Sequence, residues 1–141
     1  MPPTETDRIG FVCVRNAGRS QMATAFAERE RGRRGLDDIE IVTGGTRPAD
    51  RVHESVVTAM DEVGLDLVGR TPREITTDEL RSCDVVATMG CSTLDIGETE
   101  SAVDVHDWAL DDPGEADPDE VRAIRDEIER RVVALFEEID D

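Results

Sequence analysis

A chain of 141 residues fits one domain, and its formal net charge of −18 makes it strongly acidic. No apolar run approaches the ~20 residues that span a bilayer, and no signal segment opens the chain, so we expect a cytoplasmic protein without a membrane partner. The 16 basic residues are all arginines, and no cluster of them could release counterions, which excludes nucleic acid as a partner.

Strand and helix patterns alternate along the chain. Short apolar runs bounded by glycine indicate buried strands, and apolar residues at helical spacing indicate helices. The expected elements, in chain order, are a disordered tail at residues 1–7, a strand at 9–14, a helix at 20–30, a strand at 39–43, a helix at 49–63, a short helix at 77–82, strands at 84–89 and 102–105, and a long helix at 118–139.

Glycines set several of these expected boundaries. Gly32 and Gly35 are expected to end the first helix, the Gly44-Gly45 pair to close the second strand, and Gly64 to stop the second helix.

The alternation predicts one α/β domain over residues 8–141, built as a four-stranded parallel sheet with helices on both faces. In such sheets ligands bind beyond the carboxyl ends of the strands. Four predicted strand ends would therefore meet at one edge, carrying Cys13, Gly44, Gly90 with Cys91, and residues 107–112.

The first predicted strand runs directly into a loop that reads C-x5-R-S. The turn leads into a helix whose first amides have no partner, and such a turn binds anions and favours the thiolate form of Cys13. Arg19 can fold back and offer a planar fork to two oxygens of a tetrahedral anion. The expected oxyanion-binding residues are Val14, Arg15, Asn16, Ala17, Gly18, Arg19 and Ser20.

Two further loop residues have predicted roles. Ser20 can donate its hydroxyl to the Cys13 sulfur or cap the helix, and Asn16 tolerates a left-handed backbone and can tie the loop together. The alternative is that Cys13 is an ordinary buried strand cysteine and Arg19 a surface residue. The flanking strand and helix favour the functional interpretation, which is a cysteine-dependent phosphatase or an arsenate reductase.

The remaining composition suggests no cofactor. Three cysteines at Cys13, Cys83 and Cys91 form no C-x-x-C pair, so neither a disulfide framework nor a metal site is expected, and no tightly bound cofactor is implied. The carboxylates are spread along the whole chain, which is typical of a halophilic surface screened by salt rather than of an acidic face for a basic partner.

Four segments carry a resemblance to known proteins: the C-x5-R-S loop, Thr88-Met89-Gly90-Cys91, Trp108-Ala109-Leu110-Asp111-Asp112-Pro113 and Ile124-Arg125-Asp126-Glu127-Ile128. Together they resemble the low-molecular-weight tyrosine phosphatase superfamily, most closely its arsenate reductase branch. The resemblance implies that Cys13 is the nucleophile and that Asp112, immediately before a proline, is the general acid. A proton donor is also what expulsion of an oxygen leaving group requires; the alternative is that this segment is merely a turn.

The two branches of the superfamily share the attack by Cys13 on an arsenate or phosphate-type oxyanion. A phosphatase then hydrolyses the phosphocysteine, whereas a reductase uses a second thiol to release arsenite. Cys91 is a candidate resolving thiol, with an inert packed thiol as the equal alternative, and the segment after it contains no further cysteine. A thioredoxin, a glutaredoxin or a low-molecular-weight thiol could supply the second sulfur instead.

Two departures from the resembling proteins narrow the choice. Gly114 and Glu115 follow the Asp-Pro pair where tyrosine phosphatases carry aromatic residues, so we expect an arsenate reductase, with a phosphatase as the alternative. The potassium-binding acids of related reductases are replaced by Thr24 and Arg73, so potassium dependence by that route is not expected. A third interpretation, a non-catalytic oxyanion-binding module, would not need nucleophile, arginine and acid together.

Overall fold

The computed structural model describes residues 8–13, 15–36, 38–45, 47–89, 104–108 and 117–139. The expected tail at residues 1–7 lies outside this part of the chain. The elements are β1 (Arg8–Cys13), α1 (Arg19–Arg34), β2 (Glu40–Gly45), α2 (Glu54–Asp61), α3 (Thr77–Arg81), β3 (Val85–Met89), β4 (Asp104–Asp107) and α4 (Pro118–Ile139). No helix within the described ranges is both long and apolar enough to cross a membrane.

The expected fold class is confirmed. The four strands form one parallel sheet in the order β2-β1-β3-β4. The chain leaves β1 toward β2 on one side and later returns to place β3 on the other side of β1. This reversal takes place at β1, and sheets of this kind bind ligands beyond the carboxyl ends of the strands at such a point.

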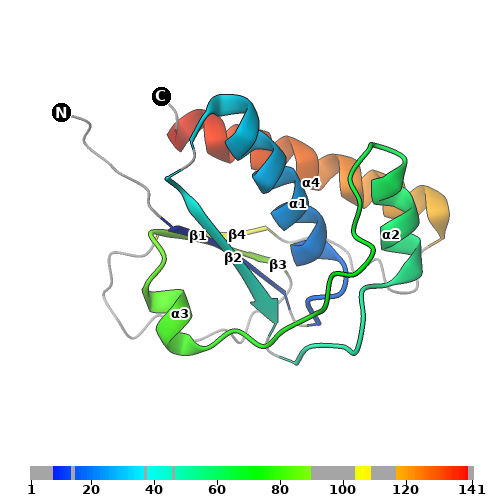
Figure 1. Ribbon diagram of the computed structural model, residues 1–141, viewed down its shortest axis with the longest axis horizontal. Coiled ribbons are helices and arrows are strands. Elements are labelled where there is room, and N and C mark those ends of the chain that lie inside the picture. The colour runs from blue at the N-terminus through cyan, green and yellow to red at the C-terminus, as the bar shows by residue number, and fades with distance from the viewer. Residues whose placement is uncertain are drawn as a thin grey trace.

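Helices cover both faces of the sheet, with α1 and α4 side by side on one face and α3 on the other (Figure 1). Residues of β1 alternate between these faces, because successive strand side chains point in opposite directions. Ile9, Phe11 and Cys13 belong to the large core beneath α1 and α4. Val12 packs with Leu80 and its neighbours in a smaller cluster beneath α3.

The terminal helix α4 begins and ends where the sequence predicts. Its five expected inward residues are all buried, namely Val121, Ile124, Ile128, Val132 and Leu135. Arg125, within the segment that carries part of the family resemblance, joins this helix to α2. Its Nη1 donates to the Ala59 carbonyl over 2.8 Å and to Glu62 over 2.9 Å.

The glycine-based boundaries were partly wrong. Gly32 lies inside α1, and the helix ends instead at Gly35, whose φ of 68° is the left-handed conformation of a C-cap. Gly44 and Gly45 belong to β2 rather than closing it. The strand continues because Gly45 donates to the Arg73 carbonyl (2.9 Å) and accepts from the Ile75 amide (3.2 Å).

The helix expected over residues 49–63 was also predicted too long, because α2 begins only at Glu54. The residues before it bind the loop after β1: the Ala49 amide donates to the Arg15 carbonyl (2.9 Å) and the His53 amide to the Ala17 carbonyl (3.0 Å). Tertiary hydrogen bonds therefore override the helical periodicity there. The last strand, expected at 102–105, is described as Asp104–Asp107.

Gly44→Ala should destabilise the protein, because a Cβ at this position would lie 2.5 Å from the Ile75 Cβ and 3.0 Å from its backbone nitrogen. We expect a loss of about 1–3 kcal/mol in the free energy of unfolding, measured by urea denaturation. Gly32→Ala is the matched control, since its added Cβ meets nothing within 4 Å. Inside a helix this substitution should raise the free energy of unfolding by about 0.5–1 kcal/mol. Equal effects of the two substitutions would contradict this packing.

A second prediction concerns Glu62, which links α2 to α4. Hydrogen bonding from Arg122, supported by Arg125, lowers the pKa of Glu62 from 4.5 to about 2. Because the folded-state pKa is the lower one, the interaction stabilises the fold above pH 4.5 and is lost as the pH falls through about 2. The stability difference between wild type and Glu62→Gln should therefore shrink over that range, while exposed Glu137→Gln serves as control. A difference that is independent of pH would refute the assignment.

Candidate active site

Cys13 is the last residue of β1 and lies at the carboxyl edge of the sheet. It pairs with Gly45 of β2 on one side and Met89 of β3 on the other. Its side chain is 2% exposed. The cysteine thus ends the strand that lies between β2 and β3, where the strand order reverses.

Two hydrogen bonds reach the sulfur of Cys13. The backbone amide of Asn16 donates to Sγ over 3.2 Å, and the Ser20 hydroxyl lies 3.0 Å from Sγ. The same hydroxyl accepts from Asn16 Nδ2 over 2.6 Å, which leaves its own hydrogen free to point at the sulfur. The Cys13 sulfur, the atom that would attack an electrophile, is thus held in place by two neighbouring groups of the same loop.

Asn16 connects the loop to three other parts of the chain through its side-chain amide. It is fully buried, and its φ of 52° is in the left-handed region. Its Oδ1 accepts from the Arg73 amide (2.9 Å) and from Gln21 Nε2 (3.1 Å), while Nδ2 also donates to Thr43 Oγ1 (3.0 Å). One buried amide therefore satisfies both its ends with groups from α1, β2 and the segment before α3.

The loop then enters α1, whose N-terminus can bind an anion. Its N-cap residue is Gly18, which supplies no side-chain cap, and the first turn contains no acidic residue. The first amides of a helix lack intrahelical partners and carry the positive end of its dipole. Arg19, the first residue of α1, is 7% exposed. Ser20, the second residue of α1, lies 3.0 Å from the Cys13 sulfur, whereas the expected loop member Val14 lies outside the described residues.

Exposed arginines border the loop. Arg15 lies within it, and Arg47 and Arg51 belong to the segment that is hydrogen-bonded to it through residues 49 and 53. Within the described ranges none of these three side chains is paired with a carboxylate. Within the described part of a protein with a net charge of −18, exposed arginines without a carboxylate partner thus lie beside the Cys13 loop, where their charge favours the approach of an anion.

Cys83 is separated from Cys13 by the length of the sheet. It precedes β3 at the end where Val85 pairs with Ile9, four residues along β1 from Cys13, which corresponds to about 13 Å. Burial raises the pKa of the Cys83 thiol to about 11, so this thiol stays protonated and unreactive at neutral pH. Cys91 and Asp112, the other predicted functional residues, lie outside the described residues.

Sequence reasoning missed three contributors to this site. Thr43, Gln21 and the Arg73 backbone hold Asn16, yet nothing in the local pattern of residues 13–20 points to them. Thr24 donates its hydroxyl to the Ser20 carbonyl over 2.7 Å.

Among the residues that the structure describes, no group of three His, Cys, Asp or Glu side chains could hold a metal ion.

Comparison with known proteins places this arrangement in a family. Residues 8–141 match the family of low molecular weight phosphotyrosine protein phosphatases. A protein of Halobacterium salinarum named "Putative arsenate reductase" is 64% identical over 139 residues, covering 98% of this chain and 96% of the relative. The glutaredoxin arsenate reductase of a Synechocystis species is 32% identical over 133 residues, covering 94% and 98%.

A solved structure agrees with these relatives. The thioredoxin-dependent arsenate reductase of Corynebacterium glutamicum superposes with a TM-score of 0.74 at 29% identity, and the match covers 96% of this chain but 62% of that one. Sequence and fold agree, and this chain belongs to the low molecular weight phosphotyrosine protein phosphatase family.

Proposed function

We propose that the protein is an arsenate reductase in which Cys13 attacks a bound oxyanion and a second thiol releases arsenite. The observation that carries this proposal is the loop geometry, with two hydrogen bonds aimed at the Cys13 sulfur beside an uncapped helix N-terminus. The named activities of the relatives from Halobacterium and Synechocystis support the choice of arsenate.

The first step is displacement at arsenic. The thiolate of Cys13 forms an S–As bond, and one As–O bond breaks. Asp112 is proposed to protonate the departing oxygen so that it leaves as water. Arg19 and the first amides of α1 are proposed to hold the remaining oxygens, because a fixed set of donors stabilises the charge of the transition state without reorganising.

The second step is a two-electron transfer. A second thiolate attacks the Cys13 sulfur and forms a disulfide, while the electron pair of the broken S–As bond stays on arsenic. Arsenic is thereby reduced from As(V) to As(III) and leaves as arsenite, and the two sulfurs are oxidised. A disulfide between two enzyme cysteines is then reduced by two external thiols or one dithiol, and a mixed disulfide on Cys13 by one further thiol; the external thiols end as a disulfide and the enzyme is restored.

The aromatic residues argue against a phosphotyrosine substrate. The chain contains three phenylalanines, one tryptophan and no tyrosine. Phe11, Phe26 and Phe136 are 0% exposed, and Trp108 is 6% exposed. Every aromatic ring is therefore used in the core, and none is left on the surface to stack against a phenol ring. A small inorganic oxyanion needs no such platform.

The second thiol is proposed to be Cys91 or an external thiol, and not Cys83. Cys83 is buried, has a raised pKa and lies at the opposite end of β3. The relatives are coupled to different proteins, one named for glutaredoxin and one for thioredoxin. A reductant of the redoxin or low-molecular-weight thiol class is therefore proposed without a choice between these proteins.

Cys13→Ser should abolish arsenite formation, since serine lacks a nucleophilic sulfur and cannot form the disulfide. The assay mixes purified protein in high salt with arsenate and, in turn, thioredoxin, glutaredoxin and small-thiol systems, and measures arsenite. Cys83→Ala is the matched control and should keep wild-type turnover. If no thiol system yields arsenite while a phosphorylated protein is dephosphorylated rapidly, the protein is a phosphatase instead. If neither reaction occurs, it is a binding module.

Disulfide mapping tests the second step separately. After exposure to arsenate and then acid quenching, mass spectrometry should find Cys13 bonded to Cys91 or to an added thiol. We expect no Cys13–Cys83 bond, because distance and the protonated state of Cys83 both oppose it. A bond from Cys13 to Cys83 would show that the resolving thiol has been assigned to the wrong part of the sheet.

A further inference from the structure

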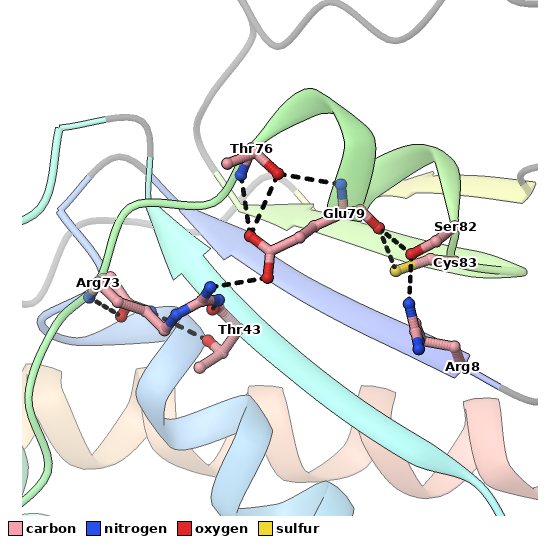
Figure 2. Close-up of polar contacts among 8 residues, drawn as sticks. Arg8, Thr43, Arg73, Thr76, Glu79, Ser82 and Cys83 are labelled. Atoms are coloured by element: carbon pink, nitrogen blue, oxygen red, sulfur yellow. Dashed lines mark hydrogen bonds and ion pairs between the residues drawn. The ribbon is translucent and has the colours of Figure 1, made fainter.

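Arg73 connects the active-site loop to helix α3 on the far face of the sheet. Its Nη1 donates to the Thr43 carbonyl over 2.7 Å, and its Nη2 donates to Glu79 Oε2 over 2.7 Å. Figure 2 shows the Arg73 side chain reaching both partners beside the end of β2. We infer that Arg73 is a positioning residue that holds the oxyanion loop in its binding shape, an inference that rests on the proposed role of that loop.

The contacts form a continuous path from Arg73 to the reactive sulfur. The Arg73 guanidinium holds Thr43, and the Thr43 hydroxyl accepts from Asn16 Nδ2 (3.0 Å) while donating to the Phe11 carbonyl (3.0 Å). From the other direction, the Arg73 amide donates to Asn16 Oδ1. Asn16 in turn contacts both Cys13 and Ser20. Displacement of Arg73 would therefore disturb both ends of the Asn16 amide.

Glu79 fixes the position from which Arg73 acts. Glu79 and Thr76 form a reciprocal capping box at the start of α3, in which Glu79 Oε1 accepts from the Thr76 amide over 3.0 Å. The other carboxylate oxygen is thereby left for Arg73. A planar guanidinium can serve a carbonyl and a carboxylate at once, which a lysine ammonium reproduces poorly.

The chain offers a matched arginine at the opposite end of the same helix and strand. Arg8 bonds Glu40 at the start of β2 (Nη2, 2.7 Å) and Ser82 just after α3 (Nη1, 2.6 Å). The two ion pairs are comparably exposed, with arginine side chains 34% exposed at Arg8 and 46% at Arg73. Figure 2 shows Arg73 and Arg8 on opposite sides of α3. Of these two arginines, only Arg73 is connected to Cys13 through the hydrogen bonds described above. Comparing substitutions at Arg73 and Arg8 therefore separates an effect on the position of the loop from a general loss of stability.

The experiment compares Arg73→Gln with Arg8→Gln in the full-length protein at 1 M KCl. One readout is the alkylation rate of the Cys13 peptide by iodoacetate at pH 7, followed by mass spectrometry. The other is the dissociation constant of inorganic phosphate, obtained from protection against that alkylation. In Arg73→Gln the rate should fall and the phosphate constant should rise by on the order of tenfold, because small misplacements at a reacting centre are costly. In Arg8→Gln both should stay within about twofold, although both variants lose a similar ion pair.

Two further variants sharpen the result. Glu79→Gln can keep the capping box, which accepts glutamine, but presents an amide that no longer accepts from Arg73 in the same way. It should shift both readouts in the same direction as Arg73→Gln, and the double variant should be no worse than Arg73→Gln alone. Arg73→Lys should fall between wild type and Arg73→Gln.

The outcomes distinguish this inference from the proposed function. Equal changes in Arg73→Gln and Arg8→Gln, with equal losses of thermal stability, would overturn the positioning role. So would an Arg73→Gln effect seen in dilute buffer but absent at 1 M KCl, where the screening length is about 3 Å and only short-range contacts survive. If neither phosphate nor arsenate protects Cys13 in the wild type, the proposed function fails, while the alkylation rates still decide the role of Arg73.

Discussion

The site depends on one buried amide in an uncommon backbone conformation. A left-handed, non-glycine residue persists only where its surroundings hold it there, and Asn16, with a φ of 52°, is held by partners at both ends of its side chain. This conformation brings the Asn16 amide to the Cys13 sulfur while the chain turns from β1 into α1. Contacts within the protein therefore fix the shape of the loop, and donors held in fixed positions are the condition for electrostatic stabilisation of a transition state.

The constraint on Asn16 reaches across the sequence. Its partner Thr43 is 27 residues away and the Arg73 amide 57 residues away. The local pattern of residues 13–20 predicts a nucleophile, a turn and a helix, because each depends on neighbouring residues alone. It does not predict which distant residues complete the hydrogen bonds of Asn16, since these are set by strand register and by the segment leading into α3. The turn and the helix were thus predictable from the local sequence, whereas the contacts that support the turn were not.

The fold shows the same division between local and distant causes. Helix α4 was predicted with its bounds, because its apolar stripe and Pro118 start are local signals. The helix expected from Ala49 was wrong at its start, because two of its amides donate to loop carbonyls instead of forming helical bonds. The prediction at Gly44 was also wrong. This glycine does not end the strand; it lets Ile75 approach the strand closely. Such close approaches between distant segments leave no signal in a single stretch of sequence.

The contacts made by three arginines give a structural reason why all basic residues of this chain are arginines. Arg8, Arg73 and Arg125 each bond two different acceptors with separate nitrogens, and each joins elements that are distant in sequence. A guanidinium offers several donors in a fixed plane, whereas an ammonium is a compact charge. In a chain with a net charge of −18, where salt is needed to screen repulsion and also weakens simple attraction, directional hydrogen bonds are the part of an ion pair that persists. Arginine therefore provides links between elements that remain effective under the conditions such an acidic surface requires.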